Sequence, residues 1–228
     1  FERVEELPTE LTPSNLSTLI EVLDWHVKNH PERVHVEFYT DVGGGPNHTY
    51  RELRERAEAI AAGLQDLGVK RNDKIILMLP TGEEYLQSFF GVLLAGGTPV
   101  PIYPLGRPDQ LEDHIRRHQY ILSNCNASVI IAPSEIKPIA RLLKVQVKSL
   151  KDIVSVVELS KTSKIFIPQE IHSTSLALIQ YTSGSTGNPK GVMLTHANLL
   201  SNIRAIGEVL RVTPKDVVVS WLPLYHDM

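Results

Sequence analysis

Short β-like runs alternate with longer stretches of helical periodicity along most of this sequence. The clearest helix is predicted to begin at Thr49, which forms a capping-box pattern with Glu52, and to stop at Gly68. Residues 75–79 and 127–132 read as buried strands, and residues 83–95 have the apolar spacing of a helix. Alternation of this kind is typical of βαβ units, so the sequence predicts an α/β fold with mostly parallel β-sheets flanked by helices.

The other predicted elements follow from the same periodicities. Apolar stripes predict a helix that Pro108 begins (Leu111, Ile115, His118, Leu122) and another after residue 195 (Leu199, Ile203, Ile206, Leu210). Residues 98–103 are broken by prolines and are expected to form an edge or irregular strand. Further expectations are a helix at 136–147, strands at 34–39, 153–157, 176–181, 192–195 and 217–221, a turn at 43–46 and a polar connector at 161–173.

Composition narrows the class of protein. The 228 residues include 23 Lys and Arg against 26 Asp and Glu, a net charge of -3 that gives no reason to expect nucleic acid or an anionic membrane as a partner. The single cysteine, Cys125, excludes an intramolecular disulfide and is interpreted as a small buried hydrophobe. No apolar run is long enough for a membrane span, and the acidic start is no signal peptide. We therefore expect a cytoplasmic protein.

The sequence stops at Met228, directly after a stretch that reads as structured and site-forming. A chain terminus usually frays out through polar residues. This ending predicts that the 228 residues are a fragment of a longer protein.

Residues 182–191 form the segment with the most specific chemistry. They contain four hydroxyl side chains (Thr182, Ser183, Ser185, Thr186), three glycines (Gly184, Gly187, Gly191) and one cation, Lys190. Glycines let backbone N–H groups approach a phosphate, hydroxyls add donors and a lysine neutralises charge, so the segment predicts a polyphosphate-binding loop. A flexible linker is the alternative, but apolar runs flank the segment on both sides. Neither the Walker spacing nor the dinucleotide-binding glycine spacing is present.

The stretch from Tyr181 to His196 resembles the signature of the adenylate-forming superfamily, which includes acyl-CoA synthetases, peptide-synthetase adenylation domains and luciferases. Residues 49–53 and 93–101 resemble two further motifs of that superfamily. Residues 221–228 are most similar to fatty acyl-AMP ligases, which pass acyl-adenylates to acyl carrier proteins. The sequence departs from that subfamily at Leu105, where a further proline is common.

The resemblance implies that a fatty acid carboxylate attacks the α-phosphate of ATP, with Mg²⁺ present, and that pyrophosphate leaves. Lys190 and His226 would be catalytic, and Thr182, Ser183, Gly184, Ser185, Thr186, Gly187 and Lys190 would hold the leaving phosphates. Trp221, Tyr225 and His226 would contact the acyl substrate. The carboxylate ligand of Mg²⁺ would lie beyond Met228. The chain would then be the N-terminal portion of the large adenylation domain, and its acceptor an acyl carrier protein or a polyketide synthase.

Several alternatives stay open at this point. An acyl-CoA synthetase differs only in its acceptor thiol, and a non-catalytic nucleotide- or acyl-binding module would need no further domain. A kinase is disfavoured because the Walker spacing is absent. His226, Trp221 and Tyr225 can also be read as core residues. His114 and His118 lie one helical turn apart, but the sequence offers no third metal ligand.

Overall fold

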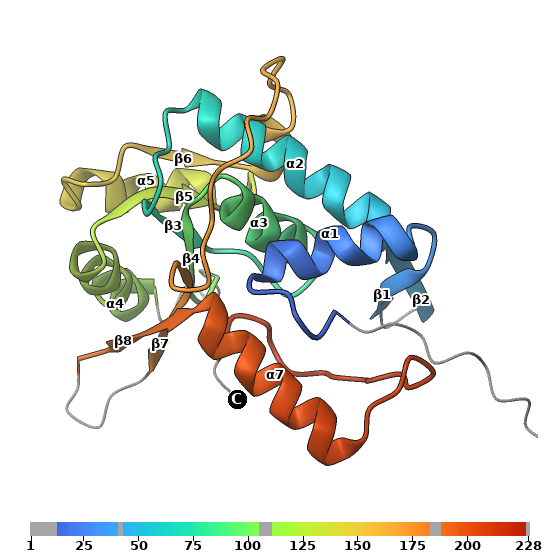
Figure 1. The fold of residues 1–228 in the computed structure, drawn as a ribbon. Coiled ribbons are helices and arrows are strands. Elements are labelled where there is room, and N and C mark those ends of the chain that lie inside the picture. Colours follow the sequence, from blue (N-terminus) through green and yellow to red (C-terminus); the bar gives the residue numbers. More distant parts are fainter. Residues whose placement is uncertain (1–12, 41–42, 105–110, 183–187, 227–228) are drawn as a thin grey trace, which may run out of the picture.

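The structure, a computed structural model, describes residues 13–40, 43–104, 111–182 and 188–226. Its centre is a parallel sheet of four strands in the order β4-β3-β5-β6 (Figure 1). These strands are β3 (Lys74–Leu77), β4 (Thr98–Pro101), β5 (Ala127–Ile131) and β6 (Asp152–Val154). The predicted α/β fold with a mainly parallel sheet is confirmed, and β4 is the edge strand that its prolines indicated.

Helices cover both faces of the central sheet. The sheet separates two apolar cores. Successive side chains of the β3 region point alternately into one core and the other, because neighbouring residues of a strand face opposite sides of a sheet. Ile75 and Leu77 pack in one apolar cluster with α2 (Tyr50–Asp66) and α3 (Glu83–Leu94). Ile76 and Met78 pack in the other with α4 (Leu111–Asn124) and α5 (Lys137–Gln146). The result is a three-layer α/β/α arrangement.

Helix starts follow local capping chemistry. Thr49 and Glu52 form the predicted capping box of α2, and Gly68 has a φ of 77° after its end. Helix α1 (Leu19–Asn29) begins with the same device at Thr18 and Glu21. Another capping box, Ser155 with Glu158, starts the short helix α6 (Val156–Leu159). The predicted strand at 153–157 is therefore wrong in its second half, because Ser155 turns the chain into a helix.

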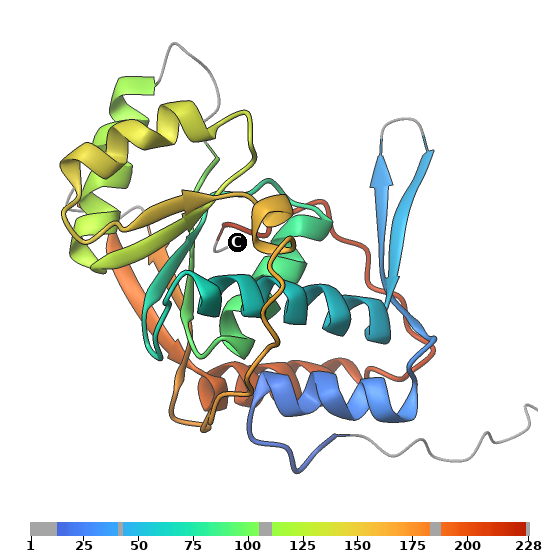
Figure 2. The same ribbon diagram turned by 90° about the horizontal axis from the view of Figure 1, so that it is seen from above.

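Two antiparallel hairpins accompany the central sheet. Strands β1 (Val34–Thr40) and β2 (Gly43–Thr49) pair with each other and stand away from the body (Figure 2). The predicted turn at 43–46 is wrong, because Gly43 already pairs with Thr40 and the glycines form the start of β2. The second hairpin, β7 (Leu176–Thr182) with β8 (Lys190–Thr195), lies beside β4 and matches the prediction for this part of the chain.

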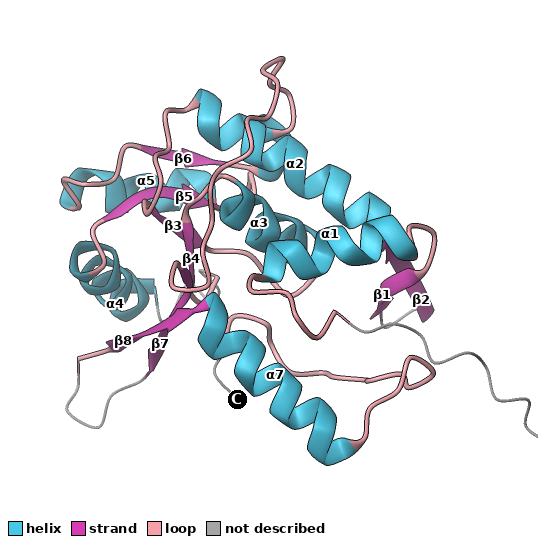
Figure 3. Cartoon of the chain, viewed as in Figure 1, coloured by secondary structure: helices cyan, strands magenta, loops and turns pink. Residues whose placement is uncertain are grey.

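Helix α7 (His196–Leu210) and the segment after it depart from expectation. Of the predicted stripe, Leu199 is partly buried and packs against the core, whereas Ile203, Ile206 and Leu210 are exposed. The buried leucine of α7 is the next residue, Leu200, which was not part of the predicted stripe. The chain then runs back along α7 without regular structure (Figure 3). The predicted strand at 217–221 is wrong: in the part of the chain that is described, no strand pairs with it. Its valines are 82–86% exposed.

No helix among the described residues is both long enough and apolar enough to cross a membrane.

Candidate functional site

The β7–β8 hairpin holds both ends of the predicted polyphosphate loop. Thr182, the last residue of β7, pairs directly with Lys190, the first residue of β8. Lys190 is exposed, whereas Pro189 before it is buried. Ser183, Gly184, Ser185, Thr186 and Gly187 lie outside the described residues. The hairpin therefore places one predicted phosphate-binding hydroxyl and the predicted cation opposite each other at the base of the loop.

Tyr181 closes the hairpin just before the loop. It pairs with Gly191 across the strands, and a Cβ on Gly191 would come within 3.0 Å of the Tyr181 Cζ atom. A side chain at residue 191 would therefore crowd the tyrosine ring, which would have to shift to make room for it. Tyr181 is 8% exposed, and burial raises its pKa well above the ordinary tyrosine value. The ring therefore packs as a neutral phenol.

The last described segment, residues 221–226, returns to the carboxyl ends of the parallel strands. The Tyr85 hydroxyl donates a 2.7 Å hydrogen bond to the Leu224 carbonyl, and the Leu224 N–H donates one of 2.9 Å to the Thr81 hydroxyl. The Gln180 amide of β7 contacts the Tyr225 carbonyl at 3.5 Å. These contacts join residues 221–226 to the β3–α3 connection and to the hairpin that carries the loop.

An aromatic cluster forms where this segment docks. The Tyr103 ring, just beyond β4, lies 5.3 Å from the Tyr225 ring and 5.6 Å from the His226 ring, centroid to centroid. Tyr225 also packs against the core on the α2–α3 face of the sheet. Ligands of open α/β sheets bind outside the carboxyl ends of the strands, which is where Tyr103, Tyr225 and His226 meet. Residues 221–226 thus bring two predicted substrate residues, Tyr225 and His226, to the edge of the sheet where ligands of such folds bind.

Trp221 behaves differently from its neighbours. It is 90% exposed, so in the described chain it contacts neither the aromatic cluster nor a core. Its predicted contact with the acyl substrate stays a prediction.

Sequence reasoning missed four residues of this site. Thr81, Tyr85, Tyr103 and Gln180 contact residues 224–226 from at least 45 positions away in the sequence. Tyr85 even sits on an ordinary helical stripe, which reads as core. No local pattern signals partners at such a separation.

Metal chemistry gains no support from the histidine pair on α4. Within the described ranges, no group of three His, Cys, Asp or Glu side chains is arranged to hold a metal ion. His118 is 1% exposed, and burial lowers its pKa to about 3. A neutral imidazole buried with the α4 stripe fits a core position.

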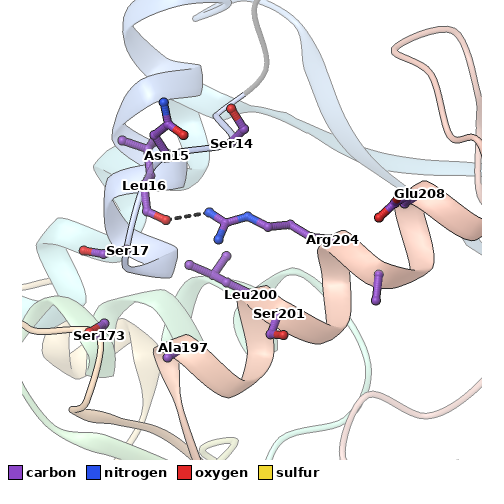
Figure 4. A pocket seen from close by; sticks show the side chains of 11 residues that line it. Ser14, Asn15, Leu16, Ser17, Ser173, Ala197, Leu200, Ser201, Arg204 and Glu208 are labelled. Carbon is purple, nitrogen blue, oxygen red and sulfur yellow. Dashed lines mark hydrogen bonds between the residues drawn. The ribbon is translucent and has the colours of Figure 1, made fainter.

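A hollow of about 580 Å³ with mixed polar and apolar lining lies elsewhere, between residues 14–17 and α7 (Figure 4). Arg204 of α7 donates a hydrogen bond to the Leu16 carbonyl across it. None of the predicted phosphate- or substrate-binding residues within the described ranges lines this hollow.

Comparison with known proteins gives matches over most of this chain. Residues 23–228 match the family described as AMP-binding enzyme. The chain is 35% identical to JamA, a medium-chain fatty acid–[acyl-carrier-protein] ligase of Moorena producens, over 95% of this chain and 37% of that protein. It is 33% identical to a long-chain fatty acid–AMP ligase of Mycolicibacterium smegmatis, over 85% of this chain and 31% of the relative. A long-chain fatty acid–CoA ligase of Escherichia coli is 30% identical over 97% of this chain and 45% of the relative.

The fold of this chain is also similar to solved structures of fatty acyl-adenylate ligases. A structure from a study of fatty acyl-adenylate ligases of E. coli and L. pneumophila superimposes with a TM-score of 0.86 at 30% identity, over 94% of this chain and 39% of that one. The L. pneumophila fatty acyl-adenylate ligase in complex with acyl adenylate and pyrophosphate gives a TM-score of 0.77 at 29% identity, over 94% and 36%. The chain spans less than half the length of each of these proteins.

Proposed function

This chain belongs to the AMP-binding enzyme family, and on that premise we propose that it supplies the polyphosphate-binding part of an enzyme that converts a fatty acid to acyl-AMP. The observation that carries the proposal is the contact between Gln180 and Tyr225. Gln180 lies two residues before Thr182, and Tyr225 lies next to His226. One contact therefore ties the polyphosphate loop to the predicted substrate residues at the carboxyl ends of the strands.

The proposed reaction needs no general base from the protein. A fatty acid carboxylate is ionised at pH 7, since such groups have pKa values of roughly 4–5. One of its oxygens forms a bond to the α-phosphorus of ATP, the bond from that phosphorus to the bridging oxygen breaks, and pyrophosphate leaves with the electron pair. Catalysis of this transfer depends on positioning and on stabilising charge.

Different residues of this chain would perform the positioning and the charge stabilisation. Thr182 and Lys190, at the base of the loop, would bind the leaving β- and γ-phosphates together with the loop residues between them. Lys190 is exposed, and among the described residues it forms no ion pair. Its ammonium group can therefore bind a charged ligand without breaking an existing salt bridge. His226 and Tyr225 would face the acyl carboxylate. Mg²⁺, held largely by the phosphate oxygens, would neutralise charge on the leaving group.

We also propose that the 228 residues are the N-terminal portion of a longer adenylation domain. The relatives described above are two to three times as long, as their 31–45% coverage shows. The exposed apolar residues of α7 and of residues 217–221 support the proposal, because exposed apolar patches of this kind usually mark a contact surface.

The proposed acceptor of the acyl group is the phosphopantetheine thiol of a carrier protein. Residues 222–227 resemble the fatty acyl-AMP ligases at this position, and JamA is by name an acyl-carrier-protein ligase. Coenzyme A carries the same thiol arm, so choice between the two acceptors must come from docking and domain movement rather than from the loop.

The test uses the natural polypeptide that contains this sequence, with ATP, Mg²⁺ and fatty acids of graded chain length. Mass spectrometry should detect acyl-AMP, which persists when coenzyme A is added and disappears when a phosphopantetheinylated carrier protein is added. Efficient acyl-CoA formation would overturn the acceptor but not the adenylation. Binding of ATP without any acyl-AMP would overturn the enzymatic proposal in favour of a binding module.

A further inference from the structure

The hairpin that carries the polyphosphate loop is attached to the body through one of its strands. Strand β7 turns Ala177, Ile179 and Tyr181 inward, and all three are buried. Strand β8 is exposed from Lys190 to Met193, and among the described strands only β7 pairs with it. The position of β8, and of Lys190 at its start, therefore depends on how β7 is held.

Tyr181 is the last inward residue of β7 before the loop. Its ring lies over Gly191 of β8, so it touches both strands at the base of the loop. With Ile179 it shares an apolar cluster with Ile121 and Leu122 of α4. The ring thus links both strands of the hairpin to one helix of the body.

A hydrogen bond completes this link. The Tyr181 hydroxyl donates to the Oδ1 atom of Asn124, the last residue of α4. Asn124 itself is exposed, so its side chain contributes little to the core. The thiol of Cys125, the next residue, also interacts with the Tyr181 hydroxyl. A phenol held at both its ring and its hydroxyl is more restricted in its position than a side chain held by apolar contacts alone.

From these contacts we propose that Asn124 and Tyr181 are positioning residues that fix the base of the polyphosphate loop, at Thr182 and Lys190, against α4. The inference rests on the proposed function, since it concerns how the loop meets its phosphates. Neither residue touches the reacting atoms. They act through Thr182 and Gly191, the neighbours of Tyr181 along and across the strands.

The test measures two quantities in the natural polypeptide: the Kd for inorganic pyrophosphate by titration calorimetry, and KM for ATP separately from kcat. Loss of one hydrogen bond should weaken pyrophosphate binding and raise KM for ATP by roughly three- to tenfold in Tyr181→Phe and in Asn124→Ala. Asn124→Gln keeps a neutral amide oxygen as acceptor and should bring both values back toward those of the unmodified protein. Ser123→Ala, on the neighbouring exposed residue of α4, and Tyr39→Phe, on an exposed strand residue, are the matched controls.

A double variant tests whether the two residues act through their shared hydrogen bond. Because both substitutions remove the same bond, Asn124→Ala combined with Tyr181→Phe should bind pyrophosphate no more weakly than the worse single variant. Multiplied effects, or variants that bind like the unmodified protein, would overturn the inference while leaving the proposed function intact. An unmodified protein that binds no pyrophosphate would overturn the proposed function itself.

Discussion

The hydroxyl of Tyr85 in α3 donates a 2.7 Å hydrogen bond to the carbonyl oxygen of Leu224, 139 positions further along the chain. Tyr85 is 4% exposed, and burial raises its pKa well above the ordinary value, so the phenol stays a neutral donor. This bond and that of Thr81 hold residues 221–226 at the carboxyl ends of the central strands.

Replacement of Tyr85 by Phe removes the donor and keeps the ring. We expect the free energy of unfolding to fall by about 1 kcal/mol, the usual net value of one hydrogen bond. Urea denaturation measures the change, with Tyr39→Phe, at a residue 78% exposed, as the control. An unchanged midpoint in Tyr85→Phe would mean that the bond does not hold the segment.

Gly63 lies inside α2, where α6 comes close. A Cβ on Gly63 would come within 2.3 Å of the Leu159 carbonyl oxygen, which is backbone and cannot easily move. Gly63→Ala should therefore destabilise the fold by at least about 2 kcal/mol, although alanine favours helices. Gly207→Ala in α7 is the matched control: nothing lies within 4 Å of its Cβ position, so we expect it to gain about 0.5–1 kcal/mol. Thermal unfolding of the two variants should shift in opposite directions.

His196 gives the fold a dependence on pH. Its Nδ1 atom accepts a 3.1 Å hydrogen bond from the Leu19 N–H, and burial lowers its pKa to about 4, against a smaller opposing effect of Glu21. Below about pH 6.5 the unfolded chain binds a proton on this residue that the folded chain excludes until about pH 4. Stability should therefore fall as the pH drops through this window.

The matched variant is His196→Gln, whose amide oxygen can accept the same bond and does not titrate. Its stability should fall less steeply than that of the unmodified chain, by at most about 1.4 kcal/mol per pH unit. Denaturation curves at several pH values between 6.5 and 4 make the comparison. Equal slopes would contradict a buried neutral imidazole at this position.

Local sequence patterns predicted most helices and strands, but they did not predict which segments pair with or pack against one another. The capping box of Thr49 and Glu52 was readable because its atoms lie within one helical turn. The valines at 153–157 indicated a strand, and the competing capping box of Ser155 and Glu158 decided otherwise. The valines at 217–219 indicate a strand in the same way, but a strand needs a partner, and the described chain supplies none.

The candidate site was predictable only in part. Thr182 and Lys190 stood out because glycines, hydroxyls and a lysine cluster in ten residues, and pairing of the flanking strands brings the two together. Tyr103 and Tyr85 carry no such signal. Their role follows from contacts with Tyr225, His226 and Leu224, which only the folded chain brings near.

The 228-residue chain alone should not catalyse the formation of acyl-AMP. The fatty acid–[acyl-carrier-protein] ligase and the fatty acid–AMP ligase that it matches are much longer, and we expect the rest of such a protein to supply part of the nucleotide site. Incubation with ATP, Mg²⁺ and a fatty acid should release no pyrophosphate above background. Turnover equal to that of the natural polypeptide would contradict our proposal that the chain is one portion of the domain.

The most direct test of the central claim is fatty-acid-dependent exchange of labelled pyrophosphate into ATP by the natural polypeptide, with and without Lys190→Ala. We predict exchange that requires a fatty acid and falls roughly 10- to 100-fold in the variant, since one charged hydrogen bond to the leaving group is lost. The melting temperature should barely change, because an exposed lysine contributes little to folding. Lys161→Ala, at another exposed lysine, is the control. Exchange that ignores the fatty acid, or that is unaffected by Lys190→Ala, would contradict the account.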